Sequence, residues 1–244
     1  MSEWFDSHCH LDAESLRISS GEDWVCASDA VLARARQVGV RSFLVVGVGG
    51  RPAAEQALAL ARRHEDVACG VGVHPHDAAH TPRADEDFLQ QQLRLGAAVA
   101  VGEVGLDYHY DHSPRAAQRE CFARWIAFTR EARLPLIVHT REAARDTLDL
   151  LRSEGAQDVG GVIHCFSEDR AFAKDALDLG FDLSFSGIVT FKSATAVHDV
   201  AAWAPLERIL VETDSPYLAP VPFRGKPCEP AYVVHTAARV AALR

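Results

Sequence analysis

Short hydrophobic segments alternate with longer helical segments along the whole chain of 244 residues, and this alternation constrains the fold more than any other feature. Apolar, β-branched runs bounded by glycine or polar residues are typical of buried strands, whereas apolar positions three and four apart are typical of helices. The pattern predicts strands near residues 4–10, 41–48, 67–73, 98–102, 135–139, 161–165, 181–185 and 208–212. It predicts helices near residues 31–38, 53–63, 84–95, 114–129, 142–153, 169–179, 193–203 and 229–243.

Eight strand–helix repeats predict an α/β protein with a (β/α)8 TIM barrel that covers residues 1–244 as one domain. The length agrees, because barrels of this kind commonly occupy about 250 residues. The alternative is an open doubly wound sheet, whose dinucleotide-binding version needs a third glycine in its fingerprint. The segment Gly47-Val-Gly49-Gly50-Arg-Pro52 lacks that third glycine, so we favour the barrel.

Two helix starts carry more specific expectations. Ser113 and Pro114 are residues typical of the N-cap and the first helical position, so they predict the start of the long fourth helix. Residues 11–27 look irregular, so the first helix is expected to begin only near Val31.

The composition bounds the class of protein. Lys+Arg 25 against Asp+Glu 34 gives a net charge of −9, which argues against a protein that coats nucleic acid through a broad basic surface. A local phosphate site remains possible, because bound divalent ions can supply the positive charge there. Met1-Ser2-Glu3-Trp4 has no basic segment followed by an apolar one, and no apolar run reaches the ~18 residues of a membrane span, which predicts a cytoplasmic protein. The spacing of the six cysteines predicts reduced, buried thiols.

The first strand carries His8 and His10. Residues two apart on a strand point to the same side, so both imidazoles project together. Two imidazoles can bind one metal ion but cannot complete its shell of four to six ligands. The remaining ligands must therefore come from other parts of the chain.

Further metal-binding side chains fall where other predicted strands end. They are His74 at the end of strand three, Glu103 at the end of strand four, His139 at the end of strand five, His164 on strand six and Asp214 after strand eight. Barrel enzymes build their sites at the C-terminal ends of the strands, so we expect these side chains to meet there. Four histidines and two carboxylates exceed the needs of one ion, and a carboxylate such as Glu103 can bridge two ions about 3.5–4 Å apart. Such a site favours hydrolysis.

At these residues the chain resembles the TatD family of metal-dependent deoxyribonucleases, within the amidohydrolase-like barrels. The motifs that carry the resemblance span nearly the whole chain. They are Asp-Ser-His8-Cys-His10-Leu-Asp, Gly-Val-His74-Pro-His, Gly-Glu103-Val-Gly-Leu-Asp-Tyr, Pro-Leu-Ile-Val-His139-Thr-Arg-Glu, His164-Cys-Phe-Ser and Glu212-Thr-Asp214-Ser-Pro-Tyr-Leu.

The resemblance implies a role for each site residue. One metal ion would be held by His8, His10 and Asp214, and Glu103 would bridge to a second held by His139 and His164. Asp214 would also accept the proton of the attacking water as general base. His74, Arg224 and Lys226 would contact the substrate phosphate.

The function implied is 3′–5′ exonuclease cleavage of DNA phosphodiester bonds by a water that two divalent ions activate. Zinc, manganese and magnesium are the candidate ions. The substrate would be single-stranded DNA or a 3′ end. The protein would have no membrane partner and would be a monomer. The alternative is hydrolysis of a non-nucleic-acid ester, lactone or amide on the same barrel, since fold does not fix function. A third possibility, an inactive binding or scaffold protein, is disfavoured by the complete ligand set.

Three features depart from the family pattern. Cys228 stands where the family often has Asn, residues 17–27 look longer than the usual first loop, and the sequence ends at Arg244, before a further C-terminal helix that such proteins usually carry. None of these departures removes an expected metal ligand.

Overall fold

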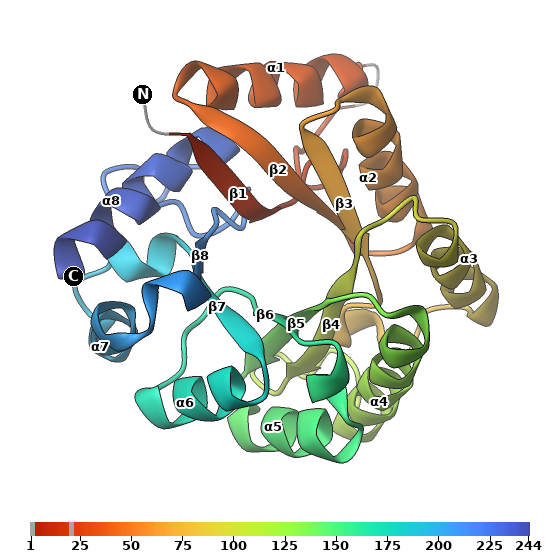
Figure 1. Ribbon diagram of the computed structural model, residues 1–244. Helices are drawn as coiled ribbons and strands as arrows, with labels where there is room; N and C mark the ends of the chain where they lie inside the picture. The colour runs from red at the N-terminus through yellow and green to blue at the C-terminus, as the bar shows by residue number, and fades with distance from the viewer. Residues whose placement is uncertain (1–2, 20–21) are drawn as a thin grey trace.

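Eight parallel strands surrounded by eight α-helices form a barrel in the computed structural model, which describes residues 3–19 and 22–244 (Figure 1). Each strand is hydrogen-bonded to the next in chain order. The strands are β1 (Trp4–Cys9), β2 (Val40–Gly47), β3 (Val67–Val71), β4 (Ala100–Asp107), β5 (Leu136–Arg141), β6 (Gly161–Ile163), β7 (Phe181–Phe185) and β8 (Ile209–Val211). The expected barrel is confirmed.

The helices form a ring outside the strands (Figure 1). They are α1 (Trp24–Gln37), α2 (Arg51–Arg63), α3 (Arg83–Arg94), α4 (Arg115–Ala132), α5 (Ala144–Ser153), α6 (Arg170–Asp178), α7 (Thr195–Trp203) and α8 (Val233–Leu243). Single turns of 3₁₀ helix occur at η1 (Pro75–Asp77), η2 (Ala156–Asp158), η3 (Gly187–Thr190), η4 (Leu206–Arg208) and η5 (Pro230–Tyr232). None of the helices in the described part of the chain is both long and apolar enough to span a lipid bilayer.

Two hydrophobic layers hold the barrel together. The larger layer lies between strands and helices and contains fully buried Phe43, Trp125 and Phe181. A smaller cluster joins Val46 and Ile137 with neighbouring residues of other strands. Burial of apolar surface on this scale is the main stabilising contribution to such a domain.

The first helix starts earlier than its sequence suggested. α1 begins at Trp24 because the Asp23 carboxylate caps it, accepting a hydrogen bond from the amide of Val25 at 2.9 Å. The expectation of an irregular stretch through residue 27 is therefore wrong at its end, and residues 20–21 within it lie outside the described part of the chain. The polar residue Ser28 occupies a buried position on this helix and interrupts the apolar spacing that would have revealed it.

The start of the fourth helix is also corrected. Pro114 is the N-cap and α4 begins at Arg115. Ser113 is buried and makes a tertiary contact instead: its hydroxyl donates to the carbonyl of His76 at 2.7 Å and accepts from the amide of Ala79 at 3.0 Å.

Strand β4 extends well beyond the expected residues 98–102. Gly102 was expected to end the strand, yet both it and Gly105 lie within β4 and have positive φ angles of 150° and 144°. A Cβ atom on Gly105 would lie 2.0 Å from the carbonyl oxygen of His139, so glycine allows β4 and β5 to approach closely. Glu103 consequently projects from within the strand, not from its end.

Smaller corrections concern two other strand ends and the thiols. β3 stops at Val71, so His74 lies beyond it as the N-cap of η1, and His164 is the residue after β6 rather than part of it. All six cysteines are free thiols; Cys26 is exposed and Cys165 partly exposed, contrary to the expectation that all are buried.

Candidate metal centre

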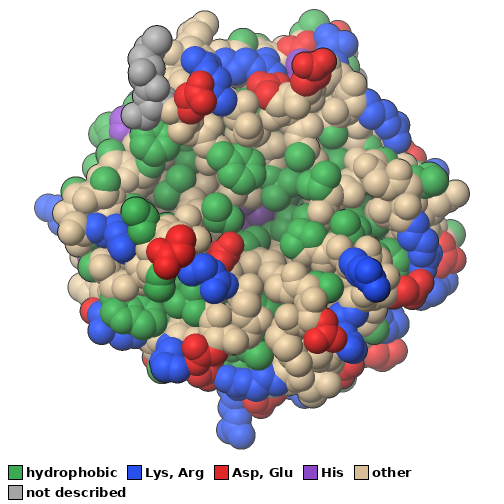
Figure 2. All heavy atoms as spheres, viewed as in Figure 1, with side chains coloured by type: hydrophobic (Ala, Val, Ile, Leu, Met, Phe, Trp, Pro, Cys, Tyr) green, Lys and Arg blue, Asp and Glu red, His purple; other side chains and the backbone are tan. Residues whose placement is uncertain are grey.

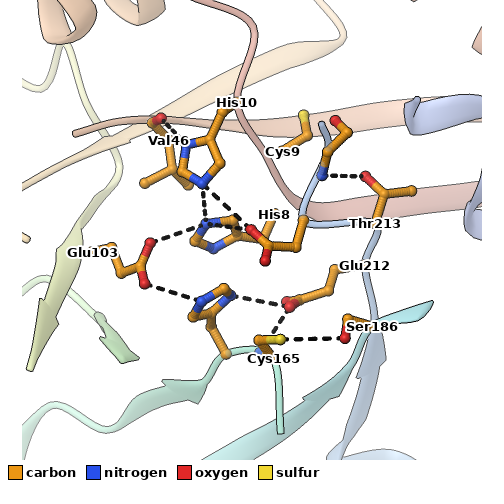
Figure 3. Close-up of polar contacts among 12 residues, drawn as sticks. His8, Cys9, His10, Val46, Glu103, Cys165, Ser186, Glu212 and Thr213 are labelled. Atoms are coloured by element: carbon orange, nitrogen blue, oxygen red, sulfur yellow. Dashed lines mark hydrogen bonds and ion pairs between the residues drawn. The ribbon is translucent and has the colours of Figure 1, made fainter. Parts of the chain in front are cut away.

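The six expected ligands meet inside the C-terminal end of the barrel. Figure 3 shows His8, His10 and Glu103 pointing toward one another; His8 and His10 project from the C-terminal end of β1, and Glu103 projects from β4. His8 Nε2 lies 3.2 Å from His10 Nε2 and 3.4 Å from Glu103 Oε2. Asp214 Oδ1 lies 3.4 Å from His10 Nε2 and 3.9 Å from His8 Nε2. These four side chains form the first donor group.

The second donor group surrounds the other oxygen of Glu103. Its Oε1 lies 2.6 Å from His139 Nδ1 and 3.0 Å from His164 Nε2. His74 Nε2 lies 3.5 Å from the same oxygen. The two oxygens of one buried carboxylate thus face two different sets of imidazoles, as a carboxylate between two cations would.

The spacing of the first group fits a metal ion. Zinc–ligand bonds of about 2.0–2.1 Å at tetrahedral angles place neighbouring ligand atoms about 3.3 Å apart. The nitrogen and oxygen atoms of His8, His10, Asp214 and Glu103 are separated by 3.2 to 3.9 Å where they face one another. Imidazole and carboxylate are also suitable ligands for manganese and iron, so the ligand types alone do not select one ion.

Closure of the barrel positions Asp214. The amide of Asp214 donates to the carbonyl of His8 at 2.9 Å, and the amide of His10 donates to the carbonyl of Ser215 at 2.8 Å. These bonds extend the pairing of the first and last strands past β8. Buried Asp6 supports the same junction, because its carboxylate accepts hydrogen bonds from the amide and hydroxyl of Thr213 at 2.8 and 2.6 Å.

Three of the histidines have one ring nitrogen fixed by an outer acceptor. His10 Nδ1 donates to the carbonyl of Val46 at 2.9 Å. His164 Nδ1 donates to Glu212 at 3.0 Å. His139 Nε2 faces Asp107 at 3.1 Å. An outer acceptor of this kind fixes the tautomer and leaves the other nitrogen free to bind a metal ion.

The two carboxylates among these acceptors, Asp107 and Glu212, were not predicted as site residues from the sequence. Both are buried, and both lie in motifs that had been singled out, after Gly-Leu and before Thr-Asp214. The available signal was spacing: Glu212 and Asp214 are two residues apart, and Asp107 follows Glu103 along the same strand by four.

The carboxylates of the centre stay ionised. Burial alone would raise the pKa of Glu103, but the charges of His164 and His74, with hydrogen bonds from the surrounding imidazoles, hold it well below its usual value. Burial also opposes ionisation of Asp214, and the hydrogen bond with His10 lowers its pKa. Burial lowers the pKa of His8, which favours the neutral imidazole that binds metals.

His74 lies beside the ligands. Its Nδ1 accepts a hydrogen bond from the amide of His76 at 3.2 Å, which leaves Nε2 as the donor facing Glu103. Its position, within reach of Glu103 and His139, also makes it a possible metal ligand.

The two expected phosphate contacts occupy different positions on one exposed loop. Lys226 lines a cavity of about 530 Å³ that reaches His10. The Arg224 guanidinium instead lies 4.2 Å from the ring centre of Phe191. The structure thus brings Lys226, but not Arg224, to the cavity beside the centre.

Comparison with known proteins identifies the family to which the chain is similar. The family model described as TatD-related DNase matches residues 5–244. The uncharacterised metal-dependent hydrolase YcfH of Escherichia coli is 45% identical over 242 residues, covering 98% of this chain and 87% of YcfH. A protein named 3′-5′ ssDNA/RNA exonuclease TatD, from Enterobacter lignolyticus, is 35% identical over 218 residues, covering 87% and 84%. The crystal structure of the E. coli TatD homologue YjjV superposes with a TM-score of 0.88 at 28% identity, covering 99% and 90%.

Proposed function

Because the chain belongs to the TatD-related DNase family of metal-dependent hydrolases, we propose that it is a deoxyribonuclease that removes nucleotides from the 3′ end of single-stranded DNA. The observation that carries the proposal is that the two buried carboxylate oxygens of Glu103 face separate donor groups. A site for two cations suits phosphodiester hydrolysis, in which both the attacking and the leaving oxygen need stabilisation. The exonuclease named among the relatives supports the choice of nucleic acid.

We assign each ligand to an ion according to the donor group in which it lies. His8, His10 and Asp214 would hold one ion, and His139 and His164 the other, with Glu103 between them. Zinc, manganese and magnesium are the candidates. When bound, the ions would polarise the phosphate and lower the pKa of the attacking water.

The protein side chains would complete the reaction. Asp214 is ionised and lies at the edge of the first donor group, so it would accept the proton of the attacking water. His74 would donate from Nε2 to a phosphate oxygen, since its Nδ1 is already an acceptor. Lys226 and Arg224 would contact phosphates as exposed cations.

The surface charge favours a short, single-stranded substrate. Figure 2 shows basic and acidic side chains interspersed around the rim of one face of the molecule. With a net charge of −9, the protein would neutralise few phosphates at once. Binding of an end through local contacts suits this surface better than wrapping a duplex.

The test uses protein stripped with a chelator and then restored with manganese, magnesium or zinc. We expect stepwise release of nucleotides from the 3′ end of labelled single-stranded DNA, and only with added metal. Protein that binds two ions yet releases nothing from DNA would refute the nuclease proposal and direct attention to esters, lactones and amides.

A further inference from the structure

A groove runs outward from the metal centre between α1 and the loop of residues 225–230. It is the cavity of about 530 Å³ noted above, and its third wall is the turn of residues 15–18. His10 and Ser215 form its inner end. A groove of this size can hold a ligand the size of a nucleotide, and one of the residues that line it, His10, is an expected metal ligand.

The inner end contains a hydroxyl without a partner. Ser215 is 1% exposed, and its Oγ makes no hydrogen bond to any residue in the described part of the chain. A buried polar group without a partner is unfavourable and rare in folded proteins. Ser215 is also one of the residues that line the groove.

One wall is apolar. Leu11, Leu16 and Val31 line it, together with the small side chain of Ala30 on α1. No Asn or Gln side chain is among the lining residues, so the wall offers an apolar contact for a base but no amide to read its edge. Binding should therefore depend little on base identity.

The rim carries net positive charge. Glu229 is the one acidic lining residue, and it is already paired with Arg34 at 2.7 and 2.9 Å. Arg17 and Lys226 also line the groove, and neither forms an ion pair within residues 3–19 and 22–244. Two unpaired cations beside an apolar wall match a ligand that has both a phosphate and a base.

We propose that this groove binds the nucleotide that flanks the scissile phosphate, with its base against the apolar wall and its phosphate at Arg17 and Lys226. The assignment rests on the proposed nuclease function, because it places the strand by reference to the metal centre. It also assigns a role to residues 15–18, which include none of the expected metal ligands.

The test compares two alanines on the same helix. Ala30 lines the groove, whereas Ala33 is equally an exposed residue of α1 but does not. A tryptophan at position 30 should fill the groove, so Ala30→Trp should weaken binding of a fluorescein-labelled, phosphorothioate-linked tetranucleotide at least about tenfold. Ala33→Trp should bind as the wild type does. Fluorescence anisotropy of the metal-loaded proteins measures both affinities.

A charge variant provides a second measurement that does not add bulk. Arg17→Gln should weaken binding of the tetranucleotide about threefold. It should also reduce the slope of log affinity against log salt concentration by about 0.7, the contribution of one phosphate contact on a single strand. In kinetics, Ala30→Trp should lose more activity on the tetranucleotide with ordinary linkages than on bis(p-nitrophenyl) phosphate, which has no nucleotide flanking its single phosphate.

The outcomes separate this inference from the nuclease proposal. Equal affinities for Ala30→Trp and Ala33→Trp, with an unchanged salt slope for Arg17→Gln, would overturn the groove assignment even if DNA is cleaved. If the wild type cleaves neither DNA nor the small diester with any metal, the nuclease proposal fails, while the anisotropy values still decide whether the groove binds a strand.

Discussion

Glu212 holds His164 in one orientation. Its Oε1 accepts a hydrogen bond from His164 Nδ1 at 3.0 Å and another from the amide of Cys165 at 2.7 Å, as the dashed lines from Glu212 show in Figure 3. The imidazole can therefore present only Nε2 to Glu103. The ligand geometry of the second donor group thus depends on a carboxylate that does not itself face Glu103.

Replacing this outer carboxylate should weaken metal binding without removing a ligand. Glu212→Gln keeps an acceptor but removes the negative charge that makes the imidazole more basic, so we expect affinity for the second ion to fall about tenfold or more. Competition with a fluorescent chelator measures it. Glu207→Gln, at an exposed residue of η4, is the matched control. Unchanged affinity in Glu212→Gln would show that the orientation of His164 does not depend on this charge.

Removal of the shared carboxylate should have a larger effect. Glu103→Ala deletes both oxygens that face the donor groups, so we expect loss of bound metal and of turnover while the circular dichroism spectrum stays native. Elemental analysis of the purified protein gives the metal content. Glu65→Ala, at an exposed position, should keep both metal and activity. A Glu103→Ala protein that retained two ions and wild-type turnover would eliminate the bridging role.

Chelation should lower the thermal stability. An ion that binds the folded state alone stabilises it by about 2.7 kcal/mol at a concentration one hundred times its dissociation constant. For a chain of this length, that corresponds to roughly 5–10 °C in melting temperature. Calorimetry with EDTA and after return of zinc measures the shift, and Glu103→Ala should show almost none. Identical melting temperatures of the wild type with and without EDTA would show that bound ions do not stabilise the folded protein.

Arg224 provides a test of phosphate binding at the loop. Its guanidinium is exposed and packs over Phe191, so truncation should cost little stability. We expect Arg224→Ala to raise the KM for DNA about tenfold, since charge-assisted contacts to phosphate are among the stronger hydrogen bonds, and to affect a small activated diester less. Arg145→Ala on α5, where the side chain is 92% exposed, is the control. Equal effects on both substrates would refute a phosphate contact.

The barrel and the ligand positions could be predicted from sequence because both depend on local patterns. Apolar runs between helices identify the strands, and the two-residue period places His8 and His10 on one side of β1. Once the strands are ordered in a barrel, residues at their C-terminal ends must lie close together. Asp214 therefore lies beside His10 although the two are far apart in the sequence.

What the sequence did not reveal depends on tertiary contacts. Asp107 and Glu212 act on histidines of other strands, and no local pattern states which partner a buried carboxylate will meet. The position of Glu103 within β4 was missed because glycine usually weakens a strand, whereas here Gly105 is needed for close packing. The groove likewise requires the turn after β1 and the loop after β8 to be adjacent.

The close approach of β4 to β5 gives a final test, which connects packing to the metal centre. Gly105 is paired with His139 and has a φ of 144°, and an added Cβ would lie 2.0 Å from the His139 carbonyl oxygen. Gly105→Ala should therefore push β5 away, lower the free energy of unfolding by about 3 kcal/mol or more, and displace the His139 imidazole from Glu103. Gly96→Ala is the control, because Gly96 has a φ of 69° but no atom within 4 Å of an added Cβ, so it should cost about 1–2 kcal/mol for the backbone conformation alone. Urea denaturation and metal analysis measure the two effects. If both variants lost the same stability and kept full metal content, the packing of β4 against β5 would not be what places His139.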